Sequence, residues 1–191
     1  MATTFLTRIV SSLLLFAAVV PAAAQTFESA YTQLELDQCQ RQAAIPDDPL
    51  ESASWWCEGY AGIPVLVAAG DLRFLVSFGA DAATEPAAGQ TLQQFNRIGT
   101  TLEWRLRSNP AEGGSTPVAT ILRYYTESDT GGDGQVLVVT KLGGPGQVCH
   151  IGYVDALLNP QANVIARQLA EAGAAAFICG SHQPTYYGVA P

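Results

Sequence analysis

The sequence predicts an α+β protein, built from an antiparallel, meander-like sheet of five or six strands with two helices packed on one face and two disulfides. Three observations predict it. Segments of alternating apolar and polar residues recur along the middle of the chain, and turns rich in Gly, Pro and Asp separate them. Two further segments have a helical spacing of apolar residues. The chain also holds four cysteines, an even number.

The strand segments share a period of two, so that one side chain in two faces a core. In residues 71–78, for example, Leu72, Phe74 and Val76 alternate with more polar neighbours, and Ala69-Gly70 before them is typical of a tight hairpin turn. We therefore expect strands over residues 63–68, 71–78, 100–107, 117–126 and 135–142, with a short last strand over 147–154.

The two helices are expected near the two ends of the strand region. Residues 29–44 have a moderate helical periodicity, and Ser29 is a suitable residue to cap the amino end. The second helix is better defined, because Asn159 is a good N-cap and Pro160 fits the first helical position. Apolar residues then follow at helical spacing until Gly173, which we expect to end the helix.

The first 24 residues have the pattern of a secretory signal peptide. Arg8 precedes an apolar run of twelve residues, 9–20, and Ala22-Ala23-Ala24 gives a small-residue cleavage site. A retained anchor is the alternative, but this run is shorter than the span of about 20 residues that a bilayer requires. We expect cleavage after Ala24, no stable membrane insertion afterwards, and a periplasmic or secreted domain over 25–191 with a loose C-terminal tail.

The cysteines all lie within residues 25–191. In an exported protein an even number predicts disulfides, and four cysteines allow three pairings. We expect Cys39–Cys57 and Cys149–Cys179, because each pair brackets one local unit of the chain. A zinc site is the competing interpretation, but it requires a closely spaced Cys or His pair, which is absent from the sequence. The sequence thus predicts no metal site, and it contains no cofactor-binding motif.

Composition and charge exclude two classes of protein. Hydrophobic residues make up 48% of the chain and charged residues 14%, which excludes a disordered polyelectrolyte. There are 9 Lys and Arg against 17 Asp and Glu. A protein that neutralises nucleic-acid phosphates needs an excess of cations, so we expect no nucleic-acid partner.

The cations are concentrated in the predicted strands, whereas acidic residues dominate the segment from Glu28 to Glu58. By alternation these cations face away from the apolar stripes, so we expect an arginine-bearing open sheet face. Guanidinium groups suit planar carboxylates and phosphates. Trp55 and Trp56 are adjacent candidates for a stacking platform, although packing against the neighbouring disulfide is the alternative. The candidate ligand-binding residues are Arg73, Arg105, Arg107, Arg123, Trp55 and Trp56. The alternative for the arginines is a solvated face that discourages aggregation.

An enzymatic function would have to use one of two histidines, and His150 is the better candidate, with Asp155 five residues later. Adjacent side chains of a strand point to opposite faces, so His150 and Cys149 do not meet in an extended strand. The alternative without catalysis is a histidine beside a disulfide that is either half-exposed or satisfied within the core.

We therefore expect an exported, non-enzymatic binding or inhibitor-type module that recognises a protein or an anionic envelope ligand. In composition it resembles the small exported lysozyme inhibitors, which are acidic, disulfide-bonded and rich in strands, but none of their signature residues is present. A small periplasmic hydrolase that uses His150, and an envelope structural protein, are the alternatives. The oligomeric state stays open.

Overall fold

In the part of the chain that the structure describes, the fold is built on two mainly antiparallel sheets and one α-helix. The computed structural model describes residues 25–43, 47–50, 52–109, 113–127 and 133–188. Sheet A has six strands in the order β1-β6-β7-β8-β9-β10, and all its neighbouring strands are antiparallel except the pair β9 and β10. Its strands are β1 (Phe27–Gln33), β6 (Phe95–Asn109), β7 (Gly114–Glu127), β8 (Asp133–Lys141), β9 (Cys149–Asp155) and β10 (Thr185–Tyr187).

Sheet B is smaller, and its four strands follow the order β2-β3-β4-β5. The two-residue turn between β4 and β5 brings Gly70 opposite Arg73. Two short 3-10 helices lie beside this sheet, η1 (Tyr60–Gly62) and η2 (Pro86–Gly89). Its strands are β2 (Gln40–Arg41), β3 (Ala53–Glu58), β4 (Pro64–Gly70) and β5 (Arg73–Phe78).

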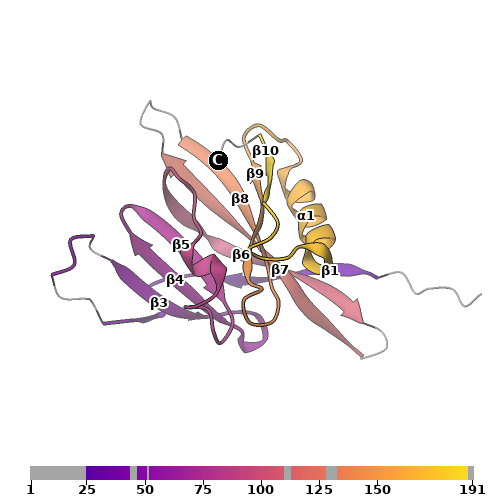
Figure 1. Ribbon diagram of the computed structural model, residues 1–191, viewed down its shortest axis with the longest axis horizontal. Coiled ribbons are helices and arrows are strands. Elements are labelled where there is room, and N and C mark those ends of the chain that lie inside the picture. The colour runs from indigo at the N-terminus through magenta and orange to yellow at the C-terminus, as the bar shows by residue number, and fades with distance from the viewer. Residues whose placement is uncertain (1–24, 44–46, 51, 110–112, 128–132, 189–191) are drawn as a thin grey trace, which may run out of the picture.

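The molecule has three layers. Figure 1 shows β3, β4 and β5 on one side of sheet A and the helix α1 (Ala162–Ala176) on the other. Sheet A is therefore covered on both faces over much of its area. This arrangement explains why Val136, Leu137, Val138 and Val139 are consecutive apolar residues and are all buried.

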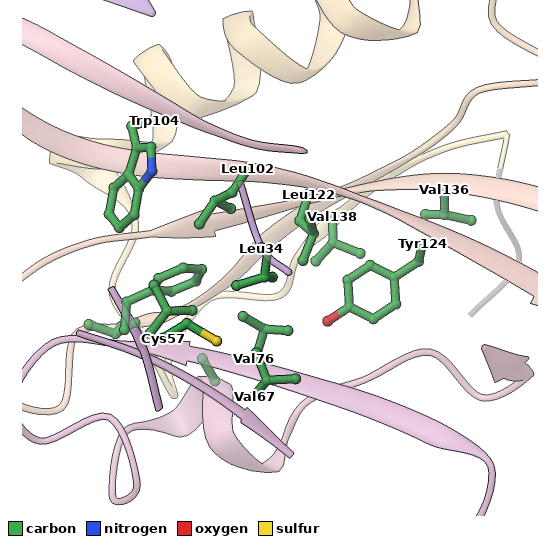
Figure 2. Close-up of a cluster of buried hydrophobic side chains, with 14 of the residues drawn as sticks. Leu34, Cys57, Val67, Val76, Leu102, Trp104, Leu122, Tyr124, Val136 and Val138 are labelled. Atoms are coloured by element: carbon green, nitrogen blue, oxygen red, sulfur yellow. The ribbon is translucent and has the colours of Figure 1, made fainter. Parts of the chain in front are cut away.

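The larger core lies between the two sheets. In Figure 2, Leu102 and Leu122 from sheet A approach Val67 and Val76 from sheet B, and Leu34 lies between them. Trp104 is the largest fully buried side chain of this core; its ring meets Phe78 edge to face, and its Nε1 donates to Thr32 Oγ1 at 2.9 Å. Burial of such large apolar side chains supplies most of the driving force for joining the two sheets.

The smaller core lies between sheet A and α1. Three alanines of the helix, Ala162, Ala166 and Ala170, are buried at the spacing of one helical face. Small residues let the helix approach the sheet closely. Gly173 belongs to the same contact, since a Cβ atom there would lie 2.6 Å from Ile151 Cδ1.

Both predicted disulfides are present, with the predicted pairing. Cys39–Cys57 joins the segment after β1 to β3, and Cys149–Cys179 joins β9 to the segment after α1. Each bond closes a local loop at one end of the fold. The predictions of strands over 63–68, 71–78, 100–107, 117–126, 135–142 and 147–154 are also confirmed, with shifted ends.

The prediction of a helix over 29–44 is wrong, because Phe27–Gln33 is the edge strand β1, paired with β6. Its side chains alternate between the two faces of sheet A. Ala30 packs against the larger core, and Leu34, directly after the strand, belongs to that core. The structure therefore has one α-helix among the described residues instead of two. That helix also starts later than expected: its N-cap is Gln161, and the Asn159 side chain instead donates to the carbonyl oxygens of Asp155 and Tyr187.

The prediction of a single sheet is also wrong, because the predicted strands divide between sheets A and B. Gly173 does not end the helix, which continues to Ala176. Part of the tail expected to be loose forms β10, which pairs in parallel with β9. The signal peptide predicted over 1–24 lies outside the described residues. Within the described part of the chain, no helix has the length and apolar character needed to cross a membrane.

Candidate functional site

The candidate site lies on the outer face of sheet A, where α1 leaves the sheet uncovered. Between the pairs Ile98–Tyr124 and Leu102–Leu122, β6 has three residues and β7 has only Arg123. This bulge bends β6, and the Thr100 carbonyl accepts a hydrogen bond from the Leu34 amide at 2.7 Å. Bulges of this kind commonly re-aim side chains beside functional sites.

A concave pocket of about 360 Å³ opens over this bulge. We call it the bulge pocket. The bulge, the centre of β7 and β8, the edge strand β1 and the first half of α1 all contribute side chains to its wall. It is lined by Tyr31, Gly99, Thr100, Thr101, Glu103, Ile121, Arg123, Tyr125, Leu137, Asn163 and Arg167.

Arg123 is the cation at the centre of the bulge pocket. Its Nη1 donates to Gln135 Oε1 at 2.9 Å, and it forms no salt bridge with any described residue. A guanidinium has five N–H donors, so a neutral amide leaves most of its hydrogen-bonding capacity and all of its charge uncompensated. Arg123 is half-buried, which strengthens its interaction with an anion relative to a fully solvated site.

Arg167, on α1, is the second cation of the pocket, and it is held in place. Its Nε donates to Glu103 Oε1 at 2.6 Å, and its Nη2 donates to Tyr31 Oη at 3.1 Å. The hydrogen bond to Glu103 raises the pKa of Arg167 above its ordinary value. The first turn of α1 carries no acidic residue, so the positive end of the helix dipole adds to these charges.

Aromatic and hydroxyl groups complete the pocket. Tyr31 is 53% exposed, and Tyr125 is half-buried with the guanidinium carbon of Arg97 4.2 Å from its ring centroid. Thr100 and Thr101 are exposed and carry hydroxyl groups that donate or accept hydrogen bonds. The pocket thus combines aromatic faces and neutral polar groups with two cations. Arg167 is compensated by the lining carboxylate of Glu103, so Arg123 is the cation that is available to an anion.

Arg105 is not on an open face, contrary to the sequence-based expectation. It is 6% exposed, because α1 covers this part of β6, and it pairs with Glu171 of the helix. The charges alternate along the contact in the order Arg167, Glu103, Arg105, Glu171, and the Ser29 hydroxyl donates to Glu103. The two arginines and two glutamates of this network neutralise each other, and their contacts hold the helix on the sheet.

The other predicted ligand-binding residues are dispersed. Arg73 lies beside the β4–β5 turn, where its Nε donates to the Gln93 carbonyl at 2.8 Å. Arg107 lines a different cavity, at the other end of β6. Trp55 packs against the larger core, with the guanidinium carbon of Arg41 5.9 Å from its ring centroid, and the next residue, Trp56, points to the opposite face of sheet B.

The six residues predicted from the sequence therefore do not form one surface, and Arg123 alone lies in the bulge pocket. Sequence reasoning missed Tyr31 and Arg167, which also line this pocket. One signal was available for Arg167. Arg167 and Glu171 lie one turn apart on the helix, and Glu103 and Arg105 lie two residues apart on the strand, so the two pairs of opposite charges have similar separations. They can therefore face each other across the contact.

The structure gives the hydrolase hypothesis no support. His150 is 1% exposed, and its Nδ1 lies 2.9 Å from Tyr153 Oη. Burial lowers the pKa of His150 from its ordinary 6.5 to about 3, so the ring is neutral at physiological pH. The Asp155 carboxylate instead accepts hydrogen bonds from the backbone amides of Leu157 and Leu158. His150 is thus a buried residue next to the disulfide-bonded Cys149.

Comparison with known proteins gives no family assignment. No protein-family model matches the chain, and neither the curated proteins nor the solved structures provide a match.

Proposed function

We propose that this chain is an exported, non-enzymatic binding module that recognises an anionic ligand through the bulge pocket. One observation carries the proposal: the half-buried Arg123 guanidinium lies in a concave site with a neutral amide as its partner. The chain as a whole has a net charge of −8. A cationic pocket on an acidic protein attracts anions locally while the rest of the surface repels them.

The chemistry of the pocket favours a carboxylate carried by a sugar ring. A guanidinium binds a carboxylate through two parallel hydrogen bonds, which gives both affinity and orientation. Tyr31 and Tyr125 offer flat apolar faces for a sugar ring. The hydroxyls of Thr100 and Thr101 and the amide of Asn163 suit the ring's own hydroxyl groups. The ligand class is therefore an acidic saccharide.

Export is the second part of the proposal. The signal-like segment 1–24 supports it, and so do the two disulfides, which form and persist in oxidising compartments. An acidic saccharide is also a ligand that an envelope or extracellular protein meets. The location and the ligand class are thus consistent with each other.

Binding of trigalacturonate, measured by isothermal titration calorimetry on the processed protein, tests the proposal. We expect the parent protein to bind trigalacturonate and not to bind neutral maltotriose. Arg123→Gln should weaken binding roughly tenfold, because it removes a charge-assisted bidentate contact, and Arg123→Glu should abolish it. Binding should also weaken as salt is added.

The matched control is Arg41→Gln, since Arg41 is an exposed arginine of sheet B, outside the pocket. It should bind as the parent does. Equal affinity of the parent and Arg123→Glu for trigalacturonate would show that the bulge pocket is not the binding site. Failure of the parent protein to bind trigalacturonate would contradict the proposal that the ligand is an acidic saccharide.

A further inference from the structure

A second cavity, which we call the elbow pocket, lies toward the opposite end of β6, β7 and α1 from the bulge pocket. It has a volume of about 480 Å³, within the usual range of small-ligand sites. Its walls come from sheet B, from the β6–β7 hairpin, from the segment between β8 and β9, and from the last turns of α1. The apolar lining side chains are Ile63, Phe78, Pro117, Val118, Leu142 and Val148.

Among the described residues that line the elbow pocket, Arg107 is the one that carries a charge. It is half-buried and forms no salt bridge with another residue in the described ranges. Apolar walls with one uncompensated guanidinium suit a molecule with an apolar body and one anionic end. A neutral apolar ligand would leave the guanidinium without a partner.

The negative end of the α1 dipole lies near the pocket, and it would oppose an anion there. The structure compensates this charge. Lys141 is buried, and its Nζ donates to the Phe177 carbonyl at the C-cap of α1. The charge of Arg107 is therefore not offset by the helix end.

The walls of the elbow pocket are fixed without a ligand. The buried carboxylate of Glu85 accepts the amides of Gly146 and Val148, each at 2.9 Å. The Val148 carbonyl accepts the Ala87 amide, and the next residue, Cys149, is bonded to Cys179. A site held open in this way loses little conformational entropy on binding.

We infer that the elbow pocket binds a free alkyl carboxylate, with the chain among the apolar walls and the carboxylate on Arg107. This inference is independent of the proposed function, because the two pockets share no lining residue. It gives the protein a second ligand of a different chemical class.

The test uses sodium decanoate as the probe, with 1-decanol and sodium acetate as ligands that lack the charge or the chain. Binding is followed by isothermal titration calorimetry, and folding of each variant by circular dichroism. We expect decanoate to bind more tightly than decanol and acetate not to bind. Arg107→Gln should weaken decanoate roughly tenfold and leave decanol unchanged, because it removes a charge-assisted contact without changing the apolar walls.

Ala174→Phe provides a second variant, since Ala174 lines the pocket and a phenyl ring would fill it. We expect it to abolish decanoate binding. Its control is Ala175→Phe, because Ala175 is the next, exposed residue of the helix and lies outside the pocket lining. Decanoate binding that is unaffected by Arg107→Gln, or absent from the folded parent, would overturn the inference, as would equal loss in both phenylalanine variants.

Discussion

Arg105 of β6 forms an ion pair with Glu171 of α1, across a sequence separation of 66 residues. Together with the Arg167–Glu103 pair, the contact joins the helix to sheet A beside the apolar face of the helix. The side chain of Arg105 is 7% exposed and that of Glu171 is 31% exposed. The two partners should therefore differ in what their removal does to stability.

Glu171→Gln should lower the free energy of unfolding by about 3 kcal/mol, because it leaves the buried Arg105 guanidinium without its closest counter-charge. Arg105→Met should cost less, about 1 kcal/mol, because water solvates part of Glu171 and Glu103 keeps its pair with Arg167. Urea denaturation followed by circular dichroism measures both. A smaller loss for Glu171→Gln than for Arg105→Met would contradict the role given to the buried cation.

His150 should make stability depend on pH. Its pKa is lowered to about 3 in the folded protein, whereas in the unfolded chain it is near 6.5. Between these values the unfolded state binds a proton that the folded state does not, so stability falls as pH drops from 6.5 toward 3. The slope from this group is about 1.4 kcal/mol per pH unit.

Unfolding by urea at several pH values between 4.5 and 6.5, compared between the parent and His150→Gln, isolates this contribution from that of the carboxyl groups. We expect a shallower slope for His150→Gln. His182→Gln is the control, since His182 is exposed, and it should keep the parent slope. Parallel slopes for the parent and His150→Gln would show that the ring is not buried as described.

The β4–β5 turn should be stabilised by glycine. Asp71 and Leu72 both have positive φ values, of 50° and 58°, and Leu72 is 69% exposed. A side chain is unfavourable in this conformation, and an exposed leucine gives little packing in return. Leu72→Gly should raise the free energy of unfolding by about 0.5 to 1 kcal/mol, even after the greater entropy of glycine in the unfolded chain.

Leu50→Gly is the control for this turn, because Leu50 is also exposed and has no positive φ. It should give no gain. The urea midpoint of each variant is the measurement. A lower midpoint for Leu72→Gly would mean that the leucine side chain contributes packing that outweighs the backbone strain.

Both disulfides should contribute strongly to stability. In the chain-entropy model, a loop of 30 residues, as for Cys149–Cys179, contributes about 3.6 kcal/mol, and one of 18 residues, as for Cys39–Cys57, about 3.2 kcal/mol. The double variants Cys149→Ser/Cys179→Ser and Cys39→Ser/Cys57→Ser should lower the melting temperature in calorimetry under oxidising conditions. With dithiothreitol present, the parent should approach the variants. A parent whose melting temperature is the same with and without reductant would contradict the prediction.

Much of the fold was predictable because its cause is local. Alternation of apolar and polar residues located the strands of β4 to β9, and the apolar spacing after Pro160 located α1. The spacing of the cysteines along the chain was enough to favour the observed pairing. In each of these cases, the residues that decide the structure lie within a few positions, or within one loop, of each other.

The edge strand and the second sheet were not predictable in the same way. Residues 27–33 have no strong local preference, and pairing with β6, about 70 residues away, makes them a strand. Alternation also does not tell which sheet a strand joins. The consecutive apolar residues of β8 are the one local sign that sheet A is covered on both faces.

The sequence by itself determined the strands β4 to β9, the main helix, the cysteine pairs and the acidic character of the chain. Only the tertiary structure decided which arginines are available to a ligand. Arg105 and Arg123 have similar sequence surroundings, but α1 covers the first and leaves the second in a pocket. The physical reason is that a guanidinium is compensated by whichever carboxylate folding brings within reach, and Glu171 reaches Arg105 from 66 residues away.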